Sequence, residues 1–335
     1  MTLEVNQIKE YLAQPRVIGL FSHRNPDGDA LGSTLAMQHL LVQMGHTVKV
    51  MVPSEYPQNF EWMPEVDKIL VWDLDSEDIK AYTNTMDFAI YLDFNSLDRI
   101  DKMGEYISNK TIKTWTIDHH IDPIIISDWI YSVPEASSTS ELVWDIIIQF
   151  GWHKYLNTQI ANCLLTGIIT DTGNFAYSVT PDLLNKVAEI LKLNVNYEFV
   201  QNAIHNTMPE KQLRLLGHCL INRMEIFPQF QAGLIYLDKE DYKNFEIKRG
   251  DTEGIVNYLL KLKNIKIAAF ITEQPTITKI SLRSKGDVNV EVICKEFFKG
   301  GGHKNAAGGA LYLPLHIVVK ILKDCLLYTS DAADD

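Results

Sequence analysis

The chain has 335 residues, of which 46% are hydrophobic and 22% charged, a composition ordinary for a folded protein long enough to form two domains. Its formal net charge of −12 argues against a general binder of duplex DNA, which usually carries a basic surface. An acidic chain can still bind an anionic substrate if metal ions supply positive charge locally.

The cysteines and the N-terminus narrow the class of protein further. Cys163, Cys219, Cys294 and Cys325 lie far apart in the sequence, which predicts reduced, buried thiols rather than a zinc ribbon or a disulfide framework. Residues 1–15 carry acidic side chains with a helical period, unlike a signal peptide, and no apolar run reaches the length of about 18 residues typical of a membrane span. We therefore expect a cytoplasmic protein with no membrane partner.

Short apolar runs alternate with helical patterns over the first part of the chain. Strands are expected over residues 16–21, 47–52, 67–72, 87–94 and 113–118. This alternation predicts a mostly parallel sheet with helices on its faces. Helices are expected next over 137–152, with Ser or Thr caps and Glu141 in the first turn, and over 157–170.

The second part of the chain begins with helical spacing and then returns to strands. We expect a first domain over residues 1–190, a helical connector over 191–226 and a smaller α/β domain over 227–323. The expected strands of that smaller domain are 230–237, 266–273 and 278–284, with a helix over 252–262. Residues 324–335 resemble a translated sequencing adapter, so a non-native tail is expected there and is left out of the fold prediction.

The stretch "HRNPDGDA" places polar side chains directly after the strand expected at 16–21. His23, Asn25, Asp27 and Asp29 occupy alternate positions, so an extended backbone would direct them to one side, into the crevice at the carboxyl ends of the strands. An ordinary turn whose aspartate caps the next helix would also explain Asn-Pro-Asp-Gly. That alternative leaves His23 and the second aspartate without a role.

Similar polar groups end other apolar runs of the first domain. They are Asp93, then Asp118, His119 and His120, and finally Asp171 in "TDTG". Clustered carboxylates stay ionised only when cations neutralise them, and two imidazoles would add neutral ligands. A mixed Asp and His site suits Mn²⁺ and related ions.

Each of these groups also has a simpler explanation. Asp93 could cap a strand end, and residues 118–120 could form a hydrogen-bonded core cluster. Asp171 in "DTG" could belong to an aspartic protease. However, a helical segment precedes Asp171, no second D-[TS]-G occurs, and the all-β pattern of such a protease is missing.

Taken together, the motifs resemble those of a known superfamily. "HRNPDGDA", "LDF", "DHH" and "TDTGNF", in this order, resemble the DHH phosphoesterase superfamily, and "GGGHKNAAGG" resembles its DHHA1 domain. The resemblance covers residues 16–323 and is strongest to the bifunctional oligoribonuclease and pAp phosphatase group, where pAp is 3′-phosphoadenosine 5′-phosphate.

The resemblance implies a centre of two divalent metal ions, Mn²⁺ above all. One ion would be held by His23, Asp27 and Asp93, and the other by Asp29, Asp93, His119 and Asp171. Asp93 would bridge the two ions. Asp118 would orient a ligand histidine, and His120 would face the substrate phosphate or the leaving oxygen, so that Asp93, Asp118 and His120 form the catalytic set. Phe94 stands where relatives often have a small residue or cysteine, which should alter packing rather than ligation.

The glycine cluster in the second domain is a candidate phosphate site. It has no Walker A spacing, and three glycines could form a flexible turn. Alternatively, glycines allow backbone amides to approach a phosphate, and an arginine can bind it with two hydrogen bonds. The resemblance implies that these positions grip the substrate: Arg283, Gly300, Gly301, Gly302 and His303.

The implied activity is hydrolysis of short oligoribonucleotides to mononucleotides and of pAp to AMP. A phosphodiesterase for cyclic dinucleotides or linear pApA remains open within the same fold. A catalytically dead nucleotide-binding module is disfavoured because every expected ligand position is filled, and a long single-strand exonuclease because no basic, aromatic track is evident. The physiological substrate, the native metal and homodimer formation stay open.

Overall fold

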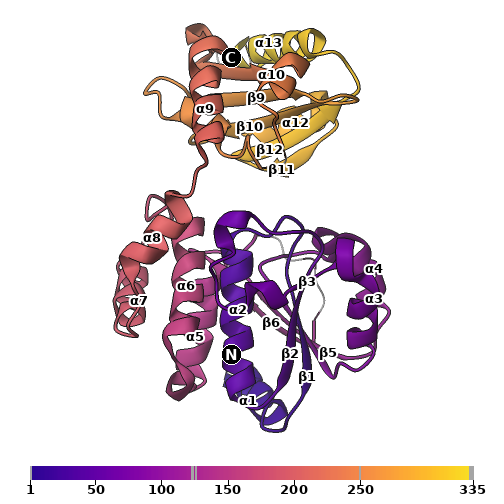
Figure 1. Cartoon of the computed structure of the whole chain (residues 1–335), viewed down its shortest axis with the longest axis vertical. Coiled ribbons are helices and arrows are strands. Elements are labelled where there is room, and N and C mark those ends of the chain that lie inside the picture. Colours follow the sequence, from indigo (N-terminus) through magenta and orange to yellow (C-terminus); the bar gives the residue numbers. More distant parts are fainter. Residues whose placement is uncertain (1, 122–123, 125–126, 249, 332–335) are drawn as a thin grey trace. The chain divides into compact units, whose positions relative to one another are not determined.

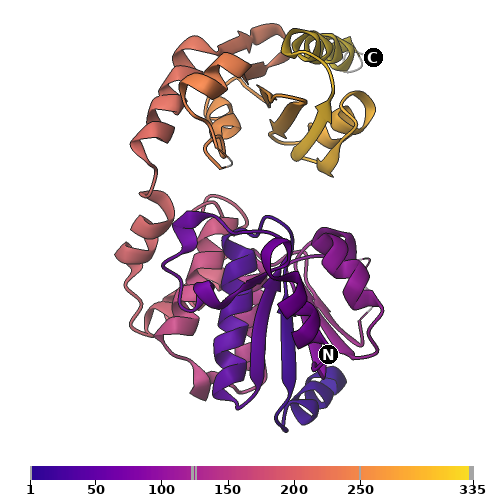
Figure 2. The same cartoon turned by 45° about the vertical axis from the view of Figure 1, so that its right-hand side comes forward.

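The computed structural model describes residues 2–121, 124, 127–248 and 250–331 (Figures 1 and 2). The chain divides into two compact units, Met1–Thr207 and Met208–Asp335. Among the described residues, no helix has both the length and the apolar character that crossing a bilayer requires. The domain limits expected from the sequence remain a proposal.

The first unit contains a six-stranded sheet in the order β3-β2-β1-β4-β5-β6, and every pairing in it is parallel. The strands are β1 (Val17–Phe21), β2 (Thr47–Val52), β3 (Leu70–Val71), β4 (Phe88–Leu92), β5 (Lys113–Asp118) and β6 (Trp129–Ser132). The parallel sheet confirms the predicted fold class. β6 was not expected, because it is a four-residue edge strand whose Ile130 faces solvent and so lacks a continuous apolar run.

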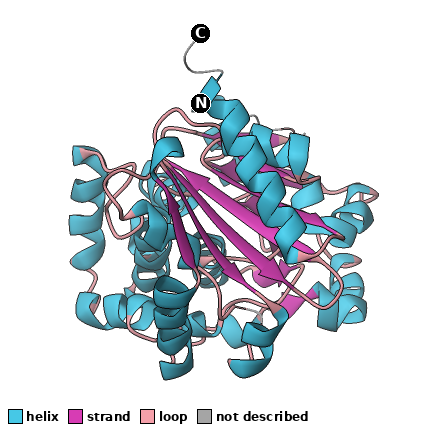
Figure 3. Ribbon diagram, turned by 90° about the horizontal axis from the view of Figure 1, so that it is seen from above, coloured by secondary structure: helices cyan, strands magenta, loops and turns pink. Residues whose placement is uncertain are grey.

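Helices cover both faces of this sheet (Figure 1), and Figure 3 gives a view from above coloured by secondary structure. They are α1 (Thr2–Tyr11), α2 (Gly28–Gln43), α3 (Trp72–Thr83), α4 (Asp101–Ser108), α5 (Thr139–Gln149), α6 (Thr158–Asp171), α7 (Pro181–Leu191) and α8 (Tyr197–His205). Alternate residues of each strand point to opposite faces. Ile18 and Leu20 of β1 therefore pack with α2, α5 and α6, whereas Phe21 packs with α3 and α4.

Glycines allow α2 and α6 to pack closely. A Cβ added to Gly28 would lie 2.8 Å from Cβ of Thr170, and one added to Gly32 would lie 2.5 Å from the Cys163 carbonyl oxygen. A Cβ added to Gly167 would overlap the Ser140 hydroxyl. Real Cβ atoms do not approach other atoms so closely, so these glycines set the spacing of the two helices.

The second unit contains a mixed sheet of six strands in the order β11-β12-β10-β9-β8-β7, in which β8 and β9 are the parallel pair. The strands are β7 (Met224–Phe227), β8 (Ala232–Leu237), β9 (Ile267–Glu273), β10 (Thr278–Ser284), β11 (Gly301–His303) and β12 (Ala306–Leu311). The glycine cluster is thus part of a sheet rather than a flexible turn.

Two helical layers cover the second sheet. The helices are α9 (Glu210–Asn222), α10 (Lys239–Asn244), α11 (Ile255–Leu260), α12 (Val290–Phe297) and α13 (Leu315–Asp331). One face packs against α12 and α13, and the other against α9 and α11. Helix α13 carries Cys325 and Leu326 into the core, so these two residues of the stretch left out of the fold prediction are part of the packed structure. All four cysteines are buried, as expected.

We predict that Gly32→Ala destabilises the protein by about 1–3 kcal/mol, because the added methyl group must displace the backbone of α6. Gly217→Ala is the matched control, since Gly217 also lies inside a helix but an added Cβ meets no atom within 4 Å. The control should be neutral or stabilising by up to about 1 kcal/mol, as alanine favours helix. Urea unfolding followed by circular dichroism measures both, and equal stability of the two variants would contradict the close packing of α2 and α6.

Candidate metal centre

The turn between β1 and α2 uses one aspartate for two purposes. Asp27 Oδ1 accepts hydrogen bonds from the backbone N–H groups of Asp29 and Ala30, each at 3.0 Å, and so caps α2. Asp27 Oδ2 lies 3.9 Å from His23 Nε2. The capping and ligand interpretations are therefore compatible, because each uses a different oxygen. Asn25 instead shapes the turn, with a left-handed φ of 54° and its N–H donated to Ser54 Oγ.

Asp93 lies between the two parts of the centre. Its Oδ2 is 3.4 Å from His23 Nε2, and its Oδ1 is 3.6 Å from His119 Nε2. It follows the last residue of β4, is 2% exposed and has a left-handed φ of 65°. Strained backbone of this kind persists only where surrounding contacts hold it. The N–H of Asp93 donates to the Ile117 carbonyl, and the adjacent Phe94 is fully buried in the core on the α3 and α4 side.

The second part of the centre gathers residues from three different segments of the chain. His119 Nε2 lies 4.0 Å from Asp29 Oδ2 at the start of α2 and 3.4 Å from Asp171 Oδ2 at the end of α6. Among the residues that the structure describes, three sets of side chains have candidate ligand atoms within 4.8 Å of one another. They are His23, Asp27 and Asp93; Asp29, His119 and Asp171; and Asp93, His119 and His120. The structure thus brings together every residue predicted as a metal ligand.

Two backbone carbonyls set the orientation of the ligand histidines. His23 Nδ1 lies 3.0 Å from the Arg24 carbonyl oxygen, and His119 Nδ1 lies 3.3 Å from that of Ala136. A carbonyl can only accept, so Nδ1 carries a proton in both rings, and Nε2 is the nitrogen that faces the carboxylates. Metal-ligating histidines are commonly fixed in this way.

Asp118 pairs with His120 and not with His119. Asp118 Oδ1 accepts a hydrogen bond from His120 Nδ1 at 2.7 Å, and its side chain is completely buried. The histidine oriented by Asp118 is therefore the one expected to face the substrate, whereas His119 is held by Ala136. Among the described atoms, Asp118 Oδ2 has no hydrogen-bond partner.

The sequence prediction missed Thr139 and Ser140 at the start of α5. Their backbone N–H groups donate to the two oxygens of Asp29, at 2.6 Å and 2.9 Å, and Thr139 Oγ1 donates to Asp93 Oδ1 at 3.0 Å. The N-terminus of a helix favours negative charge, so α5 stabilises the Asp29 carboxylate. The run "SSTSE" indicated only a cap, because its contacts with Asp29 and Asp93 are distant in the sequence.

The acidic side chains of the centre are costly to bury together without a cation. Burial, and then the charge of Asp29, raise the pKa of Asp93 well above its usual range. Burial and the same neighbour raise the pKa of Asp171 to about 7. Burial would lower the pKa of His119, but the surrounding carboxylates raise it.

A divalent cation would remove the cost of burying these carboxylates together, because it replaces the protons that they otherwise take up. The donor atoms are carboxylate oxygens and imidazole nitrogens, with no thiolate in any of the three sets of side chains. This composition suits Mn²⁺ or a related ion. The residues present therefore fit a metal centre.

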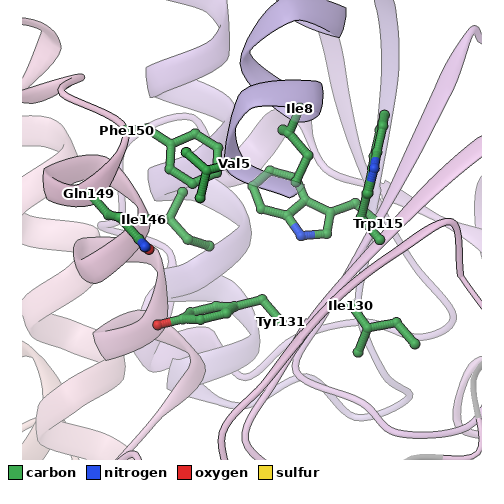
Figure 4. A pocket seen from close by; sticks show the side chains of 9 residues that line it. Val5, Ile8, Trp115, Ile130, Tyr131, Ile146, Gln149 and Phe150 are labelled. Atoms are coloured by element: carbon green, nitrogen blue, oxygen red, sulfur yellow. The ribbon is translucent and has the colours of Figure 1, made fainter. Parts of the chain in front are cut away.

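An apolar pocket in the same unit has a different character. Side chains from α1, β5, β6, α5 and the residue that follows α5 line it, and none of them is a candidate ligand (Figure 4). Its volume of about 20 Å³ leaves room for roughly one water molecule. We therefore assign the chemistry to the metal centre.

In the second unit, strand pairing places two of the predicted substrate-binding residues in one row. Arg283 of β10 is opposite Ala306 of β12, which is opposite His303 of β11, so the three occupy one row across the sheet. Arg283 is half-buried, its Nη1 donates to the Leu282 carbonyl, and it forms no ion pair within the part of the chain that the structure describes. The side chain of His303 lies outside the described part.

The three glycines predicted to bind substrate differ in how closely neighbouring atoms approach them. A Cβ on Gly302, whose φ is 147°, would lie 2.5 Å from the Ala306 carbonyl oxygen, and one on Gly300 would overlap the Gly308 carbonyl oxygen. A Cβ on Gly301 would meet only the tip of Lys295, at 4.0 Å. Close packing therefore requires glycine at positions 300 and 302, but it does not require glycine at position 301.

Comparison with known proteins identifies both units. Residues 17–168 match the N-terminal domain of the DHH family, and residues 234–323 match the DHHA1 domain. A Bacillus subtilis protein named bifunctional oligoribonuclease and PAP phosphatase NrnA is 25% identical over 298 residues, which cover 88% of each chain.

Two solved structures resemble the chain. An exopolyphosphatase-related protein from Bacteroides fragilis is 34% identical, with a TM-score of 0.97 over 100% of this chain and 98% of its own. The Thermus thermophilus RecJ structure in complex with Mn²⁺ is 12% identical, with a TM-score of 0.54 over 98% of this chain and 54% of its own, and shows a shared fold. The chain therefore belongs to the DHH family and carries the associated DHHA1 domain.

Proposed function

We propose that this protein is a metal-dependent phosphoesterase that hydrolyses short oligoribonucleotides to mononucleotides and pAp to AMP, in the cytoplasm. The observation that carries the proposal is the position of Asp93, whose two oxygens face different sets of candidate ligands. The relative from Bacillus subtilis is named for both activities. A carboxylate placed in this way can contact two ions at once.

The proposed ligands of one ion are His23, Asp27 and Asp93, and those of the other are Asp29, Asp93, His119 and Asp171. Mn²⁺ is the proposed ion, on the strength of the oxygen and nitrogen donors. Two such ions, when bound, activate a water at neutral pH and neutralise the attacking and leaving oxygens of a phosphoester.

His120 is the proposed proton donor to the leaving oxygen. Its Nδ1 donates a hydrogen bond to the buried carboxylate of Asp118. The same hydrogen bond fixes the ring orientation, so that a proton on Nε2 is held at a defined position. Asp118 thus acts through His120, and Thr139 through Asp93.

The proposed phosphate grip in the second unit consists of Arg283, His303 and the backbone at Gly301. Arg283 forms no ion pair among the described residues and is half-buried, so a substrate phosphate would satisfy its charge. Gly301 is the glycine of the cluster whose missing side chain no packing contact requires.

Substrate length tests the proposed activity. With a net charge of −12, the protein gains little from each further phosphate, so turnover should peak at chains of about two to five nucleotides and fall beyond. A ladder of 5′-labelled RNAs from about two to twenty-four nucleotides, assayed with Mn²⁺ at one salt concentration, measures this. Equal or faster turnover of the longest RNA would instead indicate a processive exonuclease. Including pAp, pApA and a cyclic dinucleotide separates the proposed substrates from those of a dinucleotide phosphodiesterase.

Asp93→Asn should abolish turnover, by at least about 1,000-fold, with little loss of folded structure, because both ions need the bridging charge. Bound Mn²⁺, measured by elemental analysis, should fall with it. Asp78→Asn is the control, since Asp78 is an exposed aspartate on α3 outside the three candidate ligand sets. Wild-type activity in Asp93→Asn would show that the two-ion assignment is wrong.

Arg283→Ala should raise KM by roughly 10- to 100-fold, because the variant loses a charge-assisted hydrogen bond to the substrate phosphate, whose free energy corresponds to a factor of about this size. The metal content should stay normal. Lys279→Ala is the matched control, because Lys279 is an exposed cation on the same strand. His303→Ala should resemble Arg283→Ala, given their shared row in the sheet. If both Arg283→Ala and His303→Ala kept normal kinetics, the glycine cluster would not belong to the active site.

A further inference from the structure

One short segment fixes three of the candidate ligands. Residues 136–140, which we call the ligand-holding segment, contact His119 through a carbonyl, Asp29 through two backbone amides and Asp93 through a hydroxyl. Residues 136–138 lie outside regular structure and 139–140 begin α5, so the segment can hold these groups in place only if the start of the helix is itself fixed. The question is therefore what anchors it.

Glu141 anchors the ligand-holding segment from inside α5. Its Oε2 accepts a hydrogen bond from the Ser137 N–H at 2.7 Å, and its own N–H donates to Ser138 Oγ at 3.0 Å. This reciprocal pair closes the first turn of the helix against the segment. The Glu141 side chain is only 8% exposed, so its charge needs a partner.

Lys186 of α7 is that partner. Its Nζ lies 2.8 Å from Glu141 Oε1, 2.8 Å from Asp145 Oδ2 and 3.0 Å from Asp182 Oδ2, and its side chain is 16% exposed. Burial alone would lower the pKa of Lys186, but the hydrogen bonds with these carboxylates raise it, so the side chain stays charged. One oxygen of Glu141 thus holds the ligand-holding segment while the other is held by α7.

We propose that Glu141 and Lys186 are positioning residues for the metal centre, which link α7 to the candidate ligands through the ligand-holding segment. This inference rests on the proposed metal centre and extends it beyond the ligands. The segment contacts Asp29 and His119 of the Asp29, His119 and Asp171 set, but only Asp93 of the other set. Loss of the anchor should therefore weaken one metal site more than the other.

Metal affinity is the decisive measurement, and Asp145 supplies a matched control. Asp145 lies on the same helix and pairs with the same lysine, but its hydrogen bond is with Lys186 and not with residues 136–140. Calorimetric titration of the metal-free full chain with Mn²⁺ should show two sites in the wild type. Glu141→Ala should weaken one of them by about 10- to 100-fold, as removal of groups that orient ligands does, and leave the other within about 3-fold. Asp171→Asn should identify the weakened site as the one that contains Asp171.

The outcomes separate this inference from the proposed function. A wild type that binds fewer than two Mn²⁺ ions would refute the proposed centre itself. A wild type with two sites, and Glu141→Ala indistinguishable from Asp145→Ala, would overturn the anchoring role. Equal weakening at both sites would show that Glu141 supports only the general stability of the fold. If Glu141→Ala does not fold, Lys186→Met tests the same link from α7, and wild-type affinity at both sites would again overturn it.

Discussion

The structure of the first unit depends on the burial of two neighbouring carboxylates, Asp29 and Asp93. Each is at most 2% exposed, and each carries a charge that the interior resists. Backbone amides at the start of α5 and the Thr139 hydroxyl offset part of this penalty, and a cation is needed for the rest. A divalent cation bound there would relieve the remaining cost of burying the two carboxylates.

Three segments that are distant in the sequence meet because a parallel sheet ends its strands at one edge. β1, β4 and β5 deliver the polar residues that follow them, and α6 brings Asp171 to the same edge. In the second unit, antiparallel pairing places Arg283 and the backbone of His303 in one row. The polar side chains of the candidate site are therefore set by short local stretches of sequence, and the topology of the sheet brings these stretches together.

The parallel sheet, the principal helices and the grouping of the candidate ligands could be predicted from the sequence. Apolar runs that end in polar residues are local signals, which can be read without knowledge of the fold. The sequence did not show which histidine Asp118 contacts, since His119 and His120 are adjacent in the chain and only the backbone path after β5 separates them. It also missed the contacts of Thr139 and Ser140 with Asp29, which depend on how α5 packs beside α2. For the glycine cluster, composition alone did not distinguish a turn from the strands β11 and β12.

The glycines between α2 and α6 have a consequence for how this fold diversifies. Gly167 leaves no room for a side chain beside Asp29 and Ser140, so even one added methyl group there would move a candidate ligand. The helix backbone at these glycines thus lies directly against its neighbours, which leaves no room for a larger residue at Gly28, Gly32 or Gly167. A chain that keeps these glycines keeps the spacing of the candidate ligands, so substitutions are better tolerated outside the contact of α2 with α6 than within it.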